Sequence, residues 1–223
     1  MYRITCQEDI EKLVEEYGFL PFFSNNVKGF SIEEMCDPKY YFTELEGPWE
    51  WKGRIAVKGE CFYGKFFRGK AGFVSKEWFP DFANYRRDGY DFDALCDEGY
   101  VRYADQGIYN MIVKRHAVTT PDLKKLCGYS GKDALKGFDS IIARLQMQTY
   151  VNIRNFVYPV DRKGNFYGWG IAQYTTPEEQ CGEDFFREVY KREPEESFRR
   201  MCEHLYKKLP DSSEDQIRKL LKR

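Results

Sequence analysis

Near residue 149 the hydrophobic pattern of this chain changes its period, and few folds accommodate that change. Before it, apolar residues recur at helical spacing, which predicts a helix from about 131 to 148. The buried stripe of that helix is expected to consist of Leu135, Phe138, Ile142 and Leu145. After it, polar and apolar residues alternate over 149–156, which predicts a strand. A turn and a second strand over 159–174 then form a hairpin whose tip carries Arg162 and Lys163.

The segment before this helix completes a known order of elements. Residues 103–116 have helical spacing, and 117–119 is expected to be extended. Thr120 is placed to cap a second helix, with Pro121 at its first position, that ends near Cys127. Helix, short strand, helix, turn, helix and hairpin is the order of a winged helix-turn-helix. The sequence therefore predicts an α+β protein with a winged helix-turn-helix core, whose wing is the hairpin tip.

The rest of the chain is expected to flank this core. A helix is predicted at 6–17, behind a capping box of Thr5 and Glu8. Strands are predicted over 49–75, including an aromatic-rich β-hairpin around the turn at 68–70. Three parts are expected, namely a mixed α/β region that is a candidate for a degenerate winged helix, the winged helix itself and a helical extension, at 1–100, 101–178 and 179–223.

Charge is segregated along the chain, although the net formal charge is only −1. Residues 48–72 and 114–165 are rich in lysine and arginine, whereas 1–47 and 88–105 are acidic. Such a chain presents a basic face to phosphates unless opposite segments neutralise each other in the fold. Segment 48–72 also interleaves cations with aromatic rings, which suits either base stacking or a core built on rings. The predicted DNA contacts are Lys65, Arg68, Lys70, Lys132, Lys136, Arg144, Arg154, Arg162 and Lys163.

Several classes of function are disfavoured. The cysteines form no CxxC pair, and neither of the two histidines lies near a cysteine pair, so no metal site is expected. Segment 64–71 lacks the Ser or Thr that a phosphate-binding loop places after its lysine, which argues against nucleotide hydrolysis. No apolar run is long enough to span a membrane, and the N-terminus lacks the apolar core of a signal peptide. We therefore expect a cytoplasmic protein with reduced thiols, no cofactor and no membrane partner.

Two amides, Gln146 and Gln148, end the third predicted helix and adjoin the strand. They point to one side only if the segment between them is already extended. Paired amides can position a water molecule or steady a developing sugar cation, but they cannot act as general bases. The other interpretation is a satisfied polar cluster at a helix end.

At this motif the chain resembles the winged-helix DNA glycosylases of the AlkZ/YcaQ superfamily, in which Gln-x-Gln or Gln-x-Asp lies at the same helix-to-strand junction. Members excise alkylated or cross-linked bases whose cationic ring is already a good leaving group. The resemblance implies that Gln148 orients the attacking water, that Gln146 supports it, and that no metal or cofactor is needed. Those glycosylases are longer, with three tandem winged helices, whereas this chain has room for one clear copy and one degenerate copy.

A wider pattern is similar to the bacterial AlkZ-related proteins, over about 45–178. It consists of Gly47-Pro-Trp-Glu-Trp-Lys52, Tyr63-Gly-Lys-Phe-Phe and Tyr167-Gly-Trp. The leading hypothesis is a winged-helix protein that contacts duplex DNA mainly through phosphates. The alternatives are a DNA glycosylase that uses Gln146 and Gln148, and a non-catalytic protein-interaction module with a protein partner or a second copy of itself.

Overall fold

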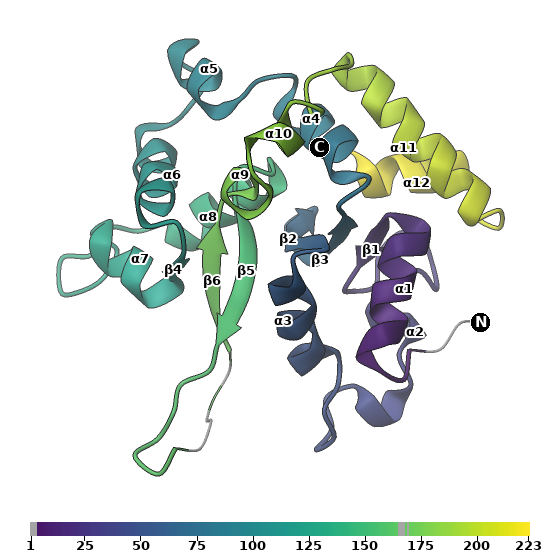
Figure 1. Cartoon of the computed structure of the whole chain (residues 1–223), viewed down its shortest axis with the longest axis horizontal. Helices are drawn as coiled ribbons and strands as arrows, with labels where there is room; N and C mark the ends of the chain where they lie inside the picture. Colours follow the sequence, from purple (N-terminus) through teal and green to yellow (C-terminus); the bar gives the residue numbers. More distant parts are fainter. Residues whose placement is uncertain (1–3, 165–167, 169) are drawn as a thin grey trace.

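Helices surround one antiparallel sheet in the computed structural model, which describes residues 4–164, 168 and 170–223 (Figure 1). Within this part of the chain, six strands pair in the order β1-β3-β2-β5-β6-β4. The strands are β1 Phe19–Pro21, β2 Cys61–Phe67, β3 Lys70–Ser75, β4 Val118–Thr119, β5 Asn152–Val157 and β6 Ile171–Thr175. The α+β class expected from the sequence is confirmed. Phe166 and most of the Tyr167-Gly-Trp motif lie outside the described residues.

The strand order is palindromic because two halves of the chain repeat one arrangement. The first half runs α1 Gln7–Tyr17, β1, α2 Ile32–Met35, the 3₁₀ turn η1 Pro38–Tyr40, α3 Pro48–Lys58, β2 and β3. The second half runs α6 Tyr103–Arg115, β4, α7 Thr120–Leu126, α8 Phe138–Met147, β5 and β6. In each half the last strand lies between the other two. The halves meet where β2 pairs with β5, at Tyr63 opposite Ile153.

Two groups of helices connect and cover these halves. They are α4 Phe79–Arg87 and α5 Phe92–Asp97 between the halves, and α9 Pro177–Cys181, α10 Glu183–Phe186, α11 Pro194–Lys208 and α12 Glu214–Leu221 after them. Helix α11 returns to pack along α4, where the rings of Tyr85 and Phe198 stack at 4.3 Å (Figure 1). No helix in the described part of the chain is both long and apolar enough to cross a membrane.

The prediction of strands over the whole of 49–75 is wrong for its first part, which forms α3. Pro48 occupies the first turn, where its missing N–H costs nothing, and Glu50 accepts from the Gly47 N–H at 2.9 Å. Gly59 ends the helix with a φ of 75°. A Cβ on Gly47 would lie 1.8 Å from the Tyr40 carbonyl oxygen, so this start requires glycine.

The third helix of the second half begins later than predicted, at Phe138. Gly131 and Gly137 adopt φ values of 100° and 93°, a left-handed conformation that interrupts a helix. Leu135 is therefore outside the stripe and is 60% exposed. The other three predicted stripe residues are buried, namely Phe138, Ile142 and Leu145. Lys132 and Lys136 consequently lie in the loop before α8 rather than on its surface.

Two predicted caps are displaced. Helix α1 begins after Cys6, and the backbone N–H and hydroxyl of Thr5 both donate to Asp9 at 2.9 Å, so the predicted capping box with Glu8 is absent. Helix α7 is capped by Thr119 rather than Thr120. In both places two residues compete for one cap, and the spacing alone does not decide between them.

The aromatic rings of β2 belong to the core. Phe62 and Phe66 are fully buried, and Phe62 stacks on Phe79 with 3.7 Å between the ring centroids. These rings therefore form part of the core and are not a surface for base stacking. Among the cations of segment 48–72, Arg54, Lys58, Arg68 and Lys70 are exposed, whereas Lys52 is buried.

Candidate functional site

A cavity of about 610 Å³ lies where the ends of α4 and α8 meet the β2–β3 turn and α12. Its lining residues are Arg68, Arg86, Arg144, Met147, Gln148, Lys219, Lys222 and Arg223. Six of them are cationic, and none of these lining residues has an acidic side chain. We call this the basic cavity. The elements that form it are far apart in the chain, so only the fold brings these charges together.

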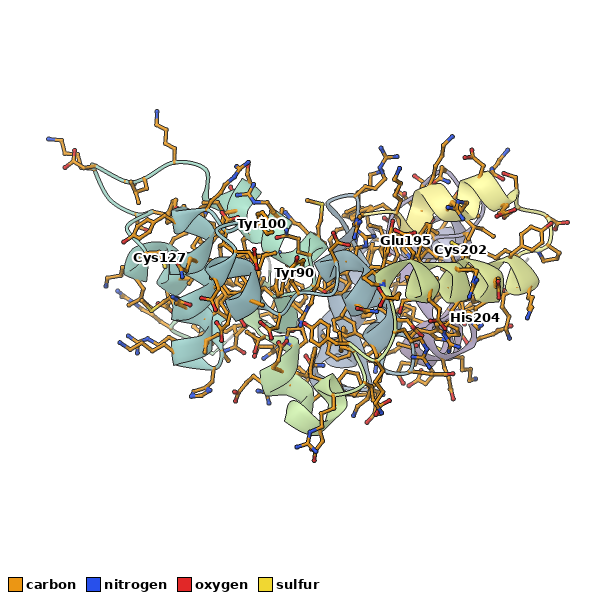
Figure 2. The ribbon with its side chains drawn as sticks, turned by 90° about the horizontal axis from the view of Figure 1, so that it is seen from above. Tyr90, Tyr100, Cys127, Glu195, Cys202 and His204 are labelled. Carbon is orange, nitrogen blue, oxygen red and sulfur yellow. The ribbon has the colours of Figure 1, made fainter. Side chains whose placement is uncertain are left out.

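A second cavity of about 430 Å³ shares Arg86, Gln148 and Arg223 with the basic cavity. Its lining also includes Tyr90, Tyr100 and Tyr150. The rings of Tyr90 and Tyr100 meet edge-on at 6.2 Å, and both residues are labelled in Figure 2. We call this the tyrosine cavity. Because Gln148 and Arg86 line both spaces, they lie between a cationic and an aromatic environment.

Gln146 and Gln148 have different surroundings. Gln146 is fully buried, where its Oε1 accepts from the Lys65 N–H at 3.1 Å and its Nε2 donates to the Ile142 carbonyl at 2.9 Å. Gln148 is half-buried and lines both cavities. The extended segment that would align the two amides is not formed, because α8 runs through Met147 and Gln148 keeps helical angles. Gln146 fits the satisfied polar cluster, and only Gln148 reaches a cavity.

The residue after Gln148 has a strained backbone. Thr149 has a φ of 63°, which is costly for a β-branched residue. Arg87 holds it there, donating from Nη2 to the Thr149 carbonyl at 2.8 Å and from Nε to its hydroxyl at 3.3 Å. Arg87 also pairs with Glu178 at 2.7 Å. This network fixes the end of α8, and with it the position of Gln148.

Adjacent arginines at the end of α4 differ in how their charge is compensated. Burial alone would lower the pKa of Arg87, but the Glu178 carboxylate and the Tyr190 hydroxyl raise it above its usual range. Arg86 is 6% exposed, and its Nε and Nη2 are buried without a hydrogen-bond partner in the described part of the chain. Burial lowers the pKa of Arg86 to about 10, and its nearest compensation is the Phe82 ring at 4.7 Å.

The remaining cations of the basic cavity fall into two groups. Three have a carboxylate partner, namely Arg144 with Asp105 at 2.7 Å, Lys219 with Asp215 at 2.8 Å and Arg223 with Asp88 at 2.5 Å. Arg68, Arg86 and Lys222 have no ion pair with any described residue. The cavity therefore holds an excess of positive charge, which suits an anion.

The structure brings only some of the predicted site residues together. Arg68, Arg144 and Gln148 line the basic cavity. The other predicted DNA contacts lie elsewhere. Lys65 is on β2, and Lys70 donates from its Nζ to the Ser24 carbonyl at 3.1 Å. Lys132 and Lys136 lie in the loop before α8, Arg154 is exposed on β5, and Arg162 and Lys163 are exposed in the turn between β5 and β6. Residues 158–164 of that turn project away from the body of the molecule (Figure 1).

Sequence reasoning missed Arg86 as a site residue. It is half of an Arg-Arg pair at a helix end, which is an ordinary surface pattern. The cavity that Arg86 lines also takes Lys219, Lys222 and Arg223 from the end of the chain, and no local pattern signals that approach. In the described residues, no group of three or more His, Cys, Asp or Glu side chains is placed to hold a metal ion.

Comparison with known proteins gives two matches. The model of the family described as "AlkZ related" matches residues 4–222. Among solved structures, the DNA glycosylase AlkZ of Streptomyces sahachiroi aligns with a TM-score of 0.48 and 11% sequence identity, over 93% of this chain. The chain covers 57% of the length of that structure. No curated protein matches the chain.

Proposed function

Because the chain belongs to the AlkZ-related family, we propose that it binds duplex DNA mainly through phosphates. The observation that carries this proposal is the basic cavity at the end of α8, with its cations in excess of their carboxylate partners. An excess of fixed positive charge attracts a polyanion. When the polyanion binds, its negative charge reduces the repulsion among the cations.

We further propose that residues 103–175 act as a winged helix. The order α6, β4, α7, α8, β5, β6 and the pairing of β6 with both β4 and β5 support this assignment. In this arrangement α8 faces the DNA, and the exposed Arg162 and Lys163 form the wing. Lys132 and Lys136 flank the start of α8, and Arg154 follows along β5.

The composition of α8 favours contact with the backbone over reading of bases. Its first turn offers Asp139 and Ser140 but no Asn or Gln, the residues that read adenine in the major groove. Asp139 is also paired with Lys124 at 3.2 Å. We therefore expect little dependence on DNA sequence and a strong dependence on salt.

The test is the salt dependence of binding to a fluorescent duplex, measured by anisotropy. The logarithm of the affinity should fall by about 0.9 per logarithmic unit of salt for each phosphate contact. Replacing Lys132 and Lys136 together by Gln should reduce that slope by about 2. Lys28→Gln changes an exposed lysine of the first half and should leave it unchanged. Binding without salt dependence would overturn the proposal and favour a protein-interaction module.

A second candidate function is that of a DNA glycosylase, and the position of Gln148 between the two cavities favours it. A flipped base would stack in the tyrosine cavity, while its phosphates lie in the basic cavity. The Gln148 carbonyl would orient a water molecule, although an amide cannot remove its proton. Gln146 would act as a positioning residue, because its bond to Lys65 holds the helix end.

Release of an alkylated base from duplex DNA tests this second candidate. Gln148→Ala should slow release at least about tenfold while DNA affinity stays within about twofold. Equal release by the wild type and the variant would remove Gln148 from catalysis. Absence of release by the wild type, with DNA binding intact, would leave the DNA-binding proposal alone.

A further inference from the structure

Arg86 is the most exceptional charged group in the described part of the molecule. A buried guanidinium normally has acceptors for its donors and a nearby carboxylate, as Arg87 has in Thr149 and Glu178. Arg86 has two buried nitrogens without acceptors and only a ring face as a partner. A charge in this state destabilises the folded protein unless something else supplies acceptors and negative charge.

The surroundings of Arg86 indicate where that compensation would come from. Its side chain lines the basic cavity, in which Arg68 and Lys222 also lack an ion pair among the described residues. The space of about 610 Å³ is ample for a phosphate group with its waters. Water alone would supply acceptors but no charge.

We propose that the basic cavity is a phosphate-binding site beside Arg86, in which the phosphate compensates the buried guanidinium charge and accepts from Nη1, the guanidinium nitrogen that is not buried, while Arg68 and Lys222 add charge. The chemistry of the lining favours phosphate over a carboxylate. A phosphate group presents its oxygens tetrahedrally and can accept from donors that approach from different sides, whereas both oxygens of a carboxylate lie in one plane. Gln148 adds a neutral amide donor at the edge of the same space.

The source of the phosphate rests on the proposed DNA binding. A backbone phosphodiester beside a nucleotide in the tyrosine cavity would reach Arg86, because Arg86 lines both spaces. A free phosphate compound has the same oxygens, so the experiments below separate the two sources.

The first experiment is thermal unfolding of the full chain with inorganic phosphate as the probe, at constant ionic strength. At about one hundred times its dissociation constant, phosphate should raise the wild-type Tm by about 5–10 °C. Arg86→Met should abolish that rise. Without phosphate its Tm should equal or exceed that of the wild type, because the variant removes an uncompensated buried charge.

Two further variants keep this test decisive. Arg199→Gln changes an exposed arginine of α11 and should retain the full phosphate-dependent rise. Arg68→Gln changes an exposed residue of the cavity rim, so it should fold normally and weaken phosphate binding several-fold even if Arg86→Met does not fold. If Arg86 serves only to pack on Phe82, the Tm of Arg86→Met is lower than the wild-type Tm by the same amount with and without phosphate. Phosphate then raises both Tm values equally, and this result overturns the proposal.

The second experiment measures DNA binding with a duplex that carries an abasic-site analogue. One neutral methylphosphonate is placed in turn at each position beside that site. At one position it should weaken wild-type binding about tenfold and leave the binding of Arg86→Met unchanged. Phosphate stabilisation without this coupling would assign the site to a free phosphate compound. Phosphate stabilisation with no DNA binding would overturn the proposed function and keep the phosphate site. DNA binding without stabilisation by phosphate and without this coupling would overturn the phosphate site and keep the proposed function.

Discussion

At the scale of single residues, the position of Gln148 depends on buried groups around the end of α8. Gln146 has no exposed surface, yet its hydrogen bond from the Lys65 N–H joins the end of α8 to β2, and its bond to the Ile142 carbonyl holds its side chain against α8. Arg87 holds Thr149 in a conformation that a threonine does not adopt alone. The cavity residue Gln148 lies between these two anchors, so its position is set from both sides.

Gln146→Ala should lower the free energy of unfolding by about 2–3 kcal/mol, because it leaves the Lys65 N–H and the Ile142 carbonyl without their side-chain partner in a buried place. Gln148→Ala should change it by less than about 0.5 kcal/mol, since that side chain lines the cavities and has no hydrogen-bond partner among the described residues. Urea unfolding followed by circular dichroism measures both. Equal losses would mean that the two amides have similar structural roles, contrary to the surroundings described for them.

Lys52 makes stability depend on pH. It is 7% exposed, and burial lowers its pKa from 10.5 to about 8, with the Phe156 ring 4.5 Å from its Nζ. Between these values the unfolded chain holds a proton that the folded chain has lost, so the contribution of Lys52 to stability rises with pH. Lys52→Met lacks this contribution.

The unfolding free energy of the wild type minus that of Lys52→Met should therefore rise by about 1.4 kcal/mol per pH unit between about pH 8 and pH 10. Taking the difference removes the opposite effect of Cys61, whose pKa burial raises to about 12. Denaturant titrations across this range provide the measurement. A difference that does not vary with pH would show that Lys52 keeps its ordinary pKa in the folded protein.

At the scale of elements, the sequence predicted helices well where one face of the helix was apolar. Helices α1 and α6 are examples, although the capping box expected at the start of α1 is absent. It failed at α3, where the tryptophans favour a strand and the start of the helix depends on the close approach of Gly47 to Tyr40. It also extended α8 too far, because Leu135 has helical spacing but follows a glycine in the left-handed conformation.

A matched pair of leucines tests the boundary of α8. Leu135→Ala should change the unfolding free energy by less than about 0.5 kcal/mol, since this side chain is 60% exposed. Leu145→Ala should cost about 2–4 kcal/mol, because it leaves a cavity in the core. Similar costs for the two would place Leu135 in the buried stripe and restore the longer helix.

At the scale of the whole molecule, the two halves form one structure. The sheet is continuous through β2 and β5, and α11 packs along α4 across the end of the first half. The basic cavity draws residues from the β2–β3 turn, α4, α8 and the end of the chain. A site assembled in this way has no sequence motif, which is why only Gln148, Arg144 and Arg68 were predicted.

This continuity predicts that the chain unfolds as one cooperative unit. Trp49, Trp51 and Trp78 all lie in or next to the first half, so the fluorescence of a Trp169→Phe variant reports that half alone. Its denaturation midpoint should coincide with the midpoint from far-ultraviolet circular dichroism, which reports the whole chain. Separate midpoints would show that the halves unfold independently.

The hydrogen bond from the Lys65 N–H to Gln146 crosses between the two halves, and it has an evolutionary consequence. Each half has the same topology, so each is a plausible unit for duplication and shuffling. The second half carries Gln148, but the partner that anchors its helix end belongs to the first half. A gene fragment encoding the second half alone would therefore carry Gln148 without the Lys65 N–H that anchors its helix end, so selection on that site acts on both halves as a single heritable unit.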